Sequence, residues 1–443
     1  MSGHGRGPLL VLLLQMLLLG AGLAATGRLT PVTVNDTPGY VEFPWDSPQA
    51  ILGHFRTPGY PAFLKIAGLV AADQQAVPLL QYVAFCGATL VLYAGCRRFL
   101  KDDWLALAAA SPLLYSRLLH GYLATVATDT LAGALGVTAM GCLLLWLVDR
   151  HWLAAAGLLL AVMLAWLVRP ASLFLVPLLP MLAVLIADVR GAVPARWRAG
   201  ALVLLLTATP VLGWSLLRWT VVGSAGIVAF GGNNLVGIAG QFLVPEDVAR
   251  LPDDLQTIAK GALARREAPE APRGPYDHEP PLHYLRMEDR YDFTIWQQFT
   301  AAAQAEYGPN HTRVNADLRR LGTALIWLHP RDYATWLVKA TRQGVKKVLW
   351  DFADSPFNLL LLAGCMVPLL RPGWIVRAAV VPGLSPTRLL LVLSLAYLGC
   401  SLALVIPVCP PLGRFTDAGA VLLASPLAVW LVGHFRARPV QGP

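Results

Sequence analysis

The chain has 443 residues, of which 56% are hydrophobic and only 14% are charged. About a quarter of the residues in a soluble domain are charged, so this composition excludes an ordinary soluble protein and predicts an all-α polytopic membrane protein. The net charge of +9 does not indicate nucleic-acid binding, because the basic residues are spread along the chain rather than clustered with aromatic ones. They fit topology determinants and contacts with membrane lipid better.

The first predicted element is the apolar run in "MSGHGRGPLLVLLLQMLLLGAGLAATG", which follows a basic tip. This pattern fits a cleaved signal peptide, and it fits an uncleaved first helix better. Under either interpretation the following segment, residues 26–76, leaves the cytoplasm.

Nine further apolar spans follow the first, which gives about ten transmembrane helices in all. They divide the chain into a transmembrane core (1–221, with the first external loop 26–76), an extracytoplasmic region (222–355) and C-terminal transmembrane helices (356–443). No internal repeat is visible, which weakens the case for a transporter built from duplicated halves. The spans are 77–96, 104–120, 122–148, 152–168, 171–187, 199–221, 356–371, 389–406 and 415–433.

The distribution of charge predicts the orientation. If the N-terminus is cytoplasmic, the cytoplasmic segments hold thirteen basic residues and four acids, whereas the long segment 222–355 holds fifteen basic and sixteen acidic residues. This difference follows the positive-inside rule. The thirteen basic residues are Arg6, Arg97, Arg98, Lys101, Arg150, Arg190, Arg196, Arg198, Arg371, Arg377, Arg388, Arg436 and Arg438.

The segment 222–355 is predicted to be external and to contain amphipathic helices. Trp327, Trp336 and Trp350 alternate with charged residues in its second half, a pattern typical of helices that lie at a membrane interface. A proline-rich stretch, residues 268–281, predicts an irregular link.

The first external loop contains the stretch "GHFRTPGYPAFLK", residues 53–65. Pro58 and Pro61 fix φ and Gly59 permits a tight turn, so we expect this stretch to hold Arg56 at one depth. We also expect Tyr60 and Phe63 to pack on the side that faces the membrane.

Seven basic residues belong neither to the cytoplasmic set nor to 222–355, and all are expected near the outer membrane boundary. Snorkelling explains any one of them, but cations at translocated helix ends work against insertion, so the set indicates a functional site. A lipid phosphate at that depth matches the planar donor fork of arginine. The seven are Arg28, Arg56, Lys65, Arg117, Arg169, Arg218 and Arg414, of which all but Arg28 are candidates for binding a carrier phosphate.

Two carboxylates are candidates for catalysis. Asp129 lies in "LATVATDTLAGALG", about two turns inside an apolar span, and an intramembrane carboxylate is a functional hypothesis by default. The alternative is a structural Asp paired with an arginine or with nearby threonines. Asp36, in "VNDTPGY", is either a turn former or a catalytic group.

The order of these motifs resembles that of the type C (GT-C) membrane glycosyltransferases, in the branch of protein O-mannosyltransferases and the lipid A aminoarabinose transferase. The resemblance covers most of residues 8–220, thins through the external region and returns near the C-terminus. It is carried by Asp36 and Tyr40, "RTPGYPAFL" (56–64), "ATDTLAGAL", "RP" (Arg169, Pro170), "PVLGWSLLRWTVVG" (210–223), "GGNNLVG", "HPRDY" (329–333) and "PPLGRF" (410–415).

The resemblance implies a GT-C-like helical bundle and an enzyme that takes a sugar from a polyprenyl-phosphate carrier. Asp36 then matches the carboxylate that activates the acceptor, Asp129 matches the acid of the fourth span, and Arg56 matches the cation before the proline. Two departures leave the acceptor open: Thr37 follows Asp36 where the family often has Glu or Ser, and Asp129 stands where Glu is common.

The expected chemistry is inverting transfer to an extracytoplasmic hydroxyl of a protein, glycan or lipid. A carboxylate acts as the base, and fixed cations stabilise the departing phosphate. No metal-ligand cluster is evident, so no cofactor is required, although a divalent metal is compatible with this chemistry. The predicted location is a bacterial plasma membrane, with the site facing outward. The alternatives from other classes are a flippase or transporter of a lipid-linked sugar and a non-catalytic scaffold subunit.

Overall fold

The computed structural model describes residues 6–189, 193–369 and 385–436. Within these ranges the chain is helical and has no strand; the one β-bridge joins Val32 to Thr125. The all-α prediction is therefore confirmed.

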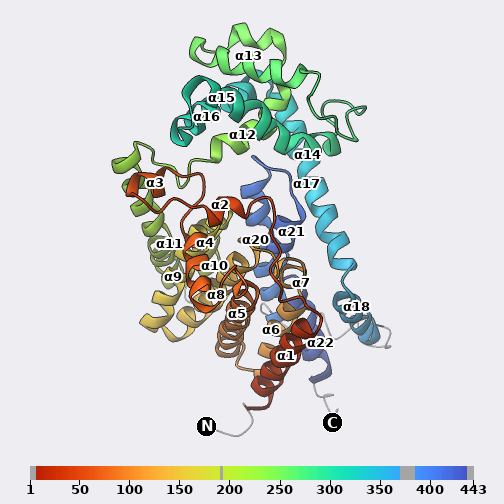
Figure 1. The fold of residues 1–443 in the computed structure, drawn as a ribbon. Helices are drawn as coiled ribbons and strands as arrows, with labels where there is room; N and C mark the ends of the chain where they lie inside the picture. The colour runs from red at the N-terminus through yellow and green to blue at the C-terminus, as the bar shows by residue number, and fades with distance from the viewer. Residues whose placement is uncertain (1–5, 190–192, 370–384, 437–443) are drawn as a thin grey trace, which may run out of the picture.

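A bundle of apolar helices forms the lower part of the molecule in Figure 1 and carries the largest buried core. Two of its helices, α5 and α8, approach closely because Gly141 on α8 faces backbone: a Cβ there would lie 2.7 Å from the carbonyl carbon of Val91. Small residues at such crossings are typical of membrane helices. The bundle helices are α1 (Arg6–Ala25), α5 (Val77–Leu100), α8 (Asp129–Asp149), α9 (Trp152–Val168), α10 (Leu175–Val189), α11 (Val193–Val222), α20 (Pro386–Val405) and α22 (Ala424–Arg436).

Six helices of the described chain are long and apolar enough to cross a membrane, so the protein is membrane-embedded. Four further apolar helices are shorter, at 10–17 residues. The predicted span 356–371 corresponds to α18 (Pro356–Leu369), and residues 370 and 371 lie outside the described ranges. Of the thirteen basic residues predicted to be cytoplasmic, Arg190, Arg371, Arg377 and Arg438 also lie outside them.

The predicted span 104–120 is not a single helix. It is divided into α6 (Asp103–Ala110), a 3₁₀ turn (Ser111–Tyr115) and α7 (Arg117–Tyr122). Pro112 lacks an amide hydrogen and so ends the regular hydrogen-bonding of α6, and Ser116 then caps α7 through the Leu119 amide. The predicted span 415–433 falls within one candidate span, Gly413–Arg436, in which a short turn joins α21 (Gly413–Gly419) to α22.

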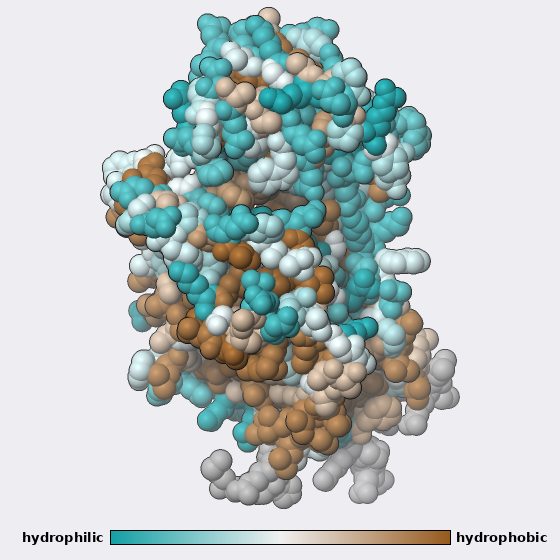
Figure 2. Space-filling model, in the orientation of Figure 1, coloured by the Kyte–Doolittle hydropathy of each residue, from teal (hydrophilic) through white to brown (hydrophobic). Residues whose placement is uncertain are grey.

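The region predicted to be external forms a second helical unit with a hydrophobic core of its own, at the top of Figure 1. On the face that Figure 2 shows, its surface is mostly hydrophilic, whereas hydrophobic residues gather over the bundle below. Its helices are α12 (Gly231–Ala239), α13 (Asp253–Glu267), α14 (Tyr284–Phe293), α15 (Ala301–Tyr307) and α16 (His311–Leu328).

The long helix α17 (Pro330–Ala353) runs from this unit down the side of the bundle to α18 (Figure 1). Trp327 and Trp350 are exposed, as expected of interfacial residues. The same prediction was wrong for Trp336, which is buried: it stacks on Tyr284 at 5.8 Å and donates to the Ile406 carbonyl at 3.0 Å.

The first external loop is partly helical and contains α2 (Pro38–Val41), α3 (Pro48–Gly53) and α4 (Gly59–Val70). Figure 1 shows α2 and α3 at the level between the two units and α4 on the bundle. Gly59 is not a turn residue, as the sequence suggested; it begins α4, where a Cβ would lie 2.5 Å from the Leu167 carbonyl at the end of α9. The stretch 53–65 is therefore anchored by a close helix contact rather than by a turn.

Candidate active site

The candidate active site lies where the first external loop meets the bundle and the external unit. Its centre is Asp36, which is held by arginines from two distant segments. Oδ1 of Asp36 accepts from Arg56 at 2.6 Å, and Oδ2 accepts from Arg414 at 2.6 Å. The structure thus brings together three residues that the sequence predicted separately.

Local structure fixes the turn that carries Asp36. The Thr37 hydroxyl donates to the Val126 carbonyl at 3.0 Å and accepts from the Val34 amide at 2.8 Å. The backbone of Val32 also bonds Ala124 and Val126. Asp36 is therefore tied to the segment that leads into α8.

The external unit fixes the loop that leads to Arg414. Three aromatic side chains donate hydrogen bonds to successive backbone carbonyls of residues 406–408. Arg414 lies at the start of α21, directly after this loop. The donors are Trp336, Tyr333 and Tyr291, at 2.9–3.0 Å.

The two arginines decide the charge of Asp36. Burial by itself would raise its pKa, but the positive charges of Arg56 and Arg414 and their hydrogen bonds outweigh burial and lower the pKa to about 2. Asp36 is therefore ionised throughout the physiological range.

A second ion pair, Asp129 with Arg169, lies beside the first. Both side chains are largely buried, at 4% and 11% exposed, and the Arg169 guanidinium lies 4.6 Å from the ring of Phe415, the neighbour of Arg414. Asp129 is the first residue of α8 rather than a residue two turns inside a helix. The prediction of its depth was wrong because residues 123–128 form the turn that bonds the first external loop.

Aromatic residues surround the Arg56 guanidinium. It lies 4.8 Å from the ring centre of Tyr40, and Tyr40 packs edge-to-face on Tyr60 at 5.0 Å. Tyr60 is fully buried inside the protein, so the expectation that it faces the membrane was wrong. Pro58 precedes the first residue of α4, and Pro61 is buried in its first turn.

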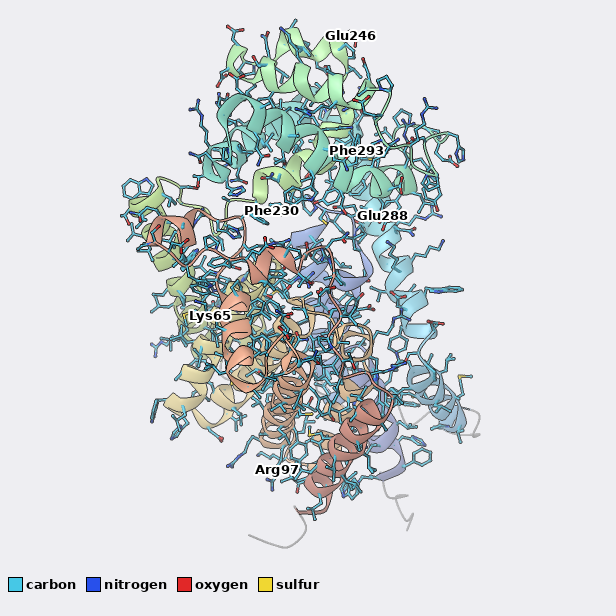
Figure 3. The ribbon with its side chains drawn as sticks, viewed as in Figure 1. Lys65, Arg97, Phe230, Glu246, Glu288 and Phe293 are labelled. Atoms are coloured by element: carbon cyan, nitrogen blue, oxygen red, sulfur yellow. The ribbon has the colours of Figure 1, made fainter. Side chains whose placement is uncertain are left out.

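Three predicted phosphate-binding residues lie in other environments. Arg117 pairs with Asp354 at 2.8 Å and approaches two further carboxylates, Asp351 and Asp417, at 3.6 Å. Lys65 lies 4.0 Å from the ring centre of Trp45, and Figure 3 shows it lower on the bundle than Phe230.

Arg218 is fully buried and donates to backbone carbonyls, to Leu52 at 2.8 Å and to Gly226. It therefore joins the end of α3 to the loop that follows α11. Among the described residues, the hydrogen bonds of its guanidinium go to carbonyl oxygens and not to a carboxylate.

Sequence reasoning missed Asp292 and an aromatic group above Arg56. Burial raises the pKa of Asp292, Arg414 opposes this rise, and Asp36 adds to it, which places Asp292 within electrostatic range of the site. Phe55 and Phe230 lie with their rings 5.2 and 5.9 Å from the Arg56 guanidinium. Phe55 lies in the stretch 53–65 that the sequence analysis singled out, but its packing on Arg56 was not predicted. No sequence signal marked Asp292 or Phe230, because each comes from a segment whose packing the sequence leaves open.

The site offers free donors for an anion. Within the described ranges, Nε of Arg56 and Nε of Arg414 are buried and have no hydrogen-bond acceptor. Buried polar groups are usually satisfied, and a phosphate has more acceptor oxygens than the Asp36 carboxylate. In the same ranges no three His, Cys, Asp or Glu residues are grouped to hold a metal ion.

Comparisons of the chain with protein-family models, curated proteins and solved structures find no match. The resemblance described from the motifs therefore stays a prediction, and the geometry of the site is the basis for proposing a function.

Proposed function

We propose that the protein is an inverting glycosyltransferase that moves a sugar from a polyprenyl-phosphate carrier to an extracytoplasmic hydroxyl. The observation that carries this proposal is Asp36 held between Arg56 and Arg414, each with an unsatisfied buried Nε. A base beside two phosphate-binding cations is the combination that displacement at a sugar phosphate requires. The order of motifs that resembles the GT-C enzymes points to the same chemistry.

The carrier phosphate is proposed to bind by exchange of partners. Its oxygens accept from Arg56 and Arg414, which in the unoccupied site donate to Asp36. As the arginines turn toward the phosphate, they stabilise the Asp36 carboxylate less, and its pKa rises from about 2 toward the usual range of a carboxyl group. Donor binding thus converts a weak base into a stronger one.

Transfer then takes place in one displacement. The acceptor oxygen attacks the anomeric carbon while its proton passes to Asp36, and the bond from that carbon to the phosphate oxygen breaks. The electron pair of that bond stays on the phosphate, where Arg56 and Arg414 stabilise the charge. Attack from the face opposite the phosphate inverts the anomeric carbon.

Asp129 and Arg169 are proposed to position this site rather than to react. Their side chains are more buried than that of Asp36 and are paired with each other. Arg169 lies against Phe415, next to Arg414, so the pair fixes the base of the loop that carries Arg414.

The proposed setting is a bundle of about ten spans in a bacterial plasma membrane, with the site at its outer face. The described parts of the chain support this arrangement: Arg97 and Arg436 pair with Asp103 and Asp102 at the end of the bundle far from α13. The predicted cytoplasmic charges and the proposed site thus lie on opposite sides of the bundle.

Donor turnover tests the proposal. Wild type, Asp36→Asn and Asp46→Asn are purified into nanodiscs, supplied with a panel of radiolabelled polyprenyl-phosphate sugars and membrane extract as acceptor, and release of polyprenyl phosphate is followed. Asp46 is an exposed carboxylate of the same external loop. We expect Asp36→Asn to lose about 10²–10⁴-fold in rate and Asp46→Asn to retain it. The proposal fails if no donor is cleaved by the wild type.

A further inference from the structure

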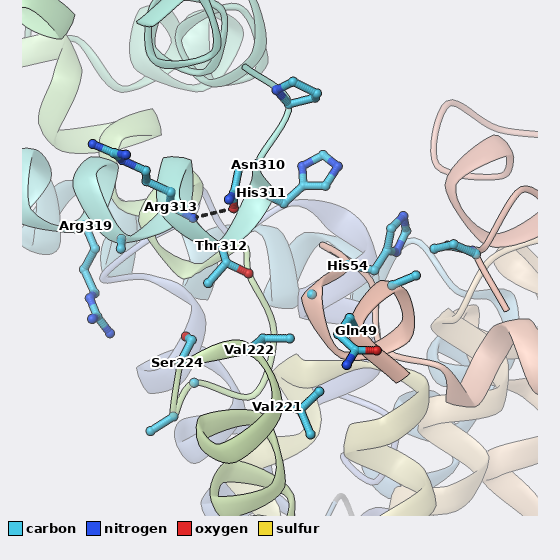
Figure 4. A pocket seen from close by; sticks show the side chains of 18 residues that line it. Gln49, His54, Val221, Val222, Ser224, Asn310, His311, Thr312, Arg313 and Arg319 are labelled. Carbon is cyan, nitrogen blue, oxygen red and sulfur yellow. Dashed lines mark hydrogen bonds between the residues drawn. The ribbon is translucent and has the colours of Figure 1, made fainter. Parts of the chain in front are cut away.

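A cavity of about 960 Å³ opens on the external side, beside the first external loop (Figure 4). Three segments enclose it: α3 with the residues after it, the end of α11 with the loop 223–226, and the start of α16. Its volume lies at the upper end of the range for ligand-binding pockets, so it has room for several linked units of a ligand rather than one small ion.

The charged groups that line this cavity are basic. Arg313 and Arg319 belong to it, and its lining contains no acidic residue. Figure 4 shows the two side chains on the α16 side. Within the described ranges Arg319 has no ion-pair partner, and Arg313 reaches Asp317 only at 3.9 Å. The Arg319 guanidinium is therefore available to an anion, whereas the Arg313 guanidinium also lies 4.1 Å from the ring centre of Tyr307 and would exchange these weak contacts for one.

The remaining polar groups suit hydroxyls. The lining includes the Gln49, Ser224 and Thr312 side chains and the rings of His54 and His311. Burial and the neighbouring His311 lower the pKa of His54 to about 4, and burial lowers that of His311. Both rings are neutral at pH 7. Nδ1 of His54 already accepts from the Arg56 amide at 3.1 Å, so His54 offers its other nitrogen as a donor, and His311 offers one donor and one acceptor.

The frame of the cavity is firmly held. Arg218 joins Leu52, in α3, to Gly226, in the loop that lines the cavity. On the other side, Asn315 of α16 accepts from the Gly232 amide at 2.7 Å and so fixes α16 against α12. The space is therefore bounded by fixed segments of the fold.

An aromatic layer connects the lining of the cavity to the Asp36 group. His311, in the lining, packs on Phe55 at 5.2 Å, and the Arg56 guanidinium lies 5.2 Å from the centre of the same Phe55 ring. Phe230 and Trp296 extend the layer, with rings stacked at 5.5 Å. Trp296 is partly exposed, so an aromatic surface joins the cavity to the site.

We propose that this cavity binds the acceptor, and that the acceptor is an acidic glycan. The inference rests on the proposed function, because it assigns the cavity to the hydroxyl-bearing substrate of the Asp36 site. Arg313 and Arg319 bind carboxylate or phosphate groups of the glycan, the amide, hydroxyl and imidazole groups bind its hydroxyls, and the aromatic layer supports its sugar rings on the way to Asp36.

Binding of defined oligosaccharides to the full chain in nanodiscs tests this inference. The probes are an oligogalacturonate, a phosphorylated mannan oligosaccharide and neutral maltohexaose, with affinities measured by microscale thermophoresis. The two acidic probes distinguish carboxylate from phosphate recognition. The variants are the double substitution Arg313→Gln with Arg319→Gln and, as a control of equal charge, Arg331→Gln with Arg342→Gln on exposed positions of α17.

We expect wild type to bind at least one acidic probe about tenfold or more tightly than maltohexaose. The double variant in the cavity should lose about tenfold in that affinity, as expected when two solvent-exposed ionic contacts are removed. The α17 control should change by less than about twofold. Equal affinity for neutral and acidic probes, or equal binding by both double variants, would overturn the inference.

The two proposals fail separately. Loss of acidic-glycan selectivity with intact donor cleavage overturns the acceptor assignment alone. Selective binding that depends on Arg313 and Arg319, without cleavage of any polyprenyl-phosphate sugar, counts against the proposed function and leaves the cavity as a glycan site. The melting temperatures of both double variants show whether either loss comes from unfolding.

Discussion

At the scale of single residues, the state of the proposed site depends on whether Arg56 and Arg414 donate their hydrogen bonds to Asp36 or to a bound phosphate. Asp36, Arg56 and Arg414 were predictable as candidate site residues from their motifs, because charged residues retained near a membrane boundary usually mark a functional site. Their mutual pairing was not predictable, since 378 positions separate Asp36 from Arg414 in sequence. Tertiary packing also decided that Arg218 would bind backbone carbonyls rather than an anion.

The ion pairs of Asp36 predict how stability depends on pH. Its pKa is lowered from 3.8 to about 2, so the pairs stabilise the folded state fully above the unfolded pKa, and this contribution is lost as the pH falls through about 2. The contribution is about 2 kcal/mol.

We therefore expect Asp36→Asn to lower the melting temperature at about pH 6 and to lower it much less at about pH 2.5, by the linkage of protonation to folding. Thermal unfolding of the detergent-solubilised protein measures this. Asp46→Asn serves as the control, because Asp46 has no ion pair within the described ranges. A deficit of Asp36→Asn that is the same at both pH values would show that the arginines do not lower the pKa of Asp36.

At the scale of elements, α4 is held in place by contact with α9. The sequence pattern "RTPGYP" indicated a rigid segment, and the segment is rigid for a different reason: the first residue of α4 lies against the backbone at the end of α9. Sequence alone does not distinguish a glycine needed for a turn from one needed for close approach, since both exclude a Cβ.

We expect Gly59→Ala to destabilise the protein by about 1–3 kcal/mol, as overpacking does, because its Cβ would lie 2.5 Å from Leu167 backbone atoms. Gly68→Ala in the same helix is the matched control, since a Cβ there has nothing within 4 Å. It should be neutral or stabilising by up to about 1 kcal/mol. Thermal unfolding of both variants measures the difference, and equal melting temperatures would contradict the contact.

At the scale of the whole molecule, composition predicted a helical membrane protein with a polar external region, and the hydropathy pattern located most helices. The hydropathy pattern gave the wrong structure in two places: residues 104–120 are not one helix, and Trp336 is buried. A proline ends the helix in the first place, and a stacked aromatic partner buries the side chain in the second. Hydropathy averaged over neighbouring residues detects neither cause.

The orientation of the molecule is testable by cysteine labelling. The native cysteines are buried or partly buried, so an impermeant maleimide should give low background. We expect Glu246→Cys, at the top of the external unit in Figure 3, to be labelled on intact cells, and Arg98→Cys to be labelled only after permeabilisation, as the positive-inside rule requires. The reverse pattern would place the Asp36 site on the cytoplasmic side.

Binding of polyprenyl phosphate to nanodisc-embedded variants tests the exchange of partners at Asp36 most directly. Arg56→Gln and Arg414→Gln should each weaken binding by about tenfold, whereas Asp36→Asn should strengthen it by about threefold or more, because it removes the carboxylate that competes for both arginines. Opposite changes from neighbours 2.6 Å apart would support a shared phosphate site. Unchanged affinity in all three variants would show that the carrier phosphate binds elsewhere.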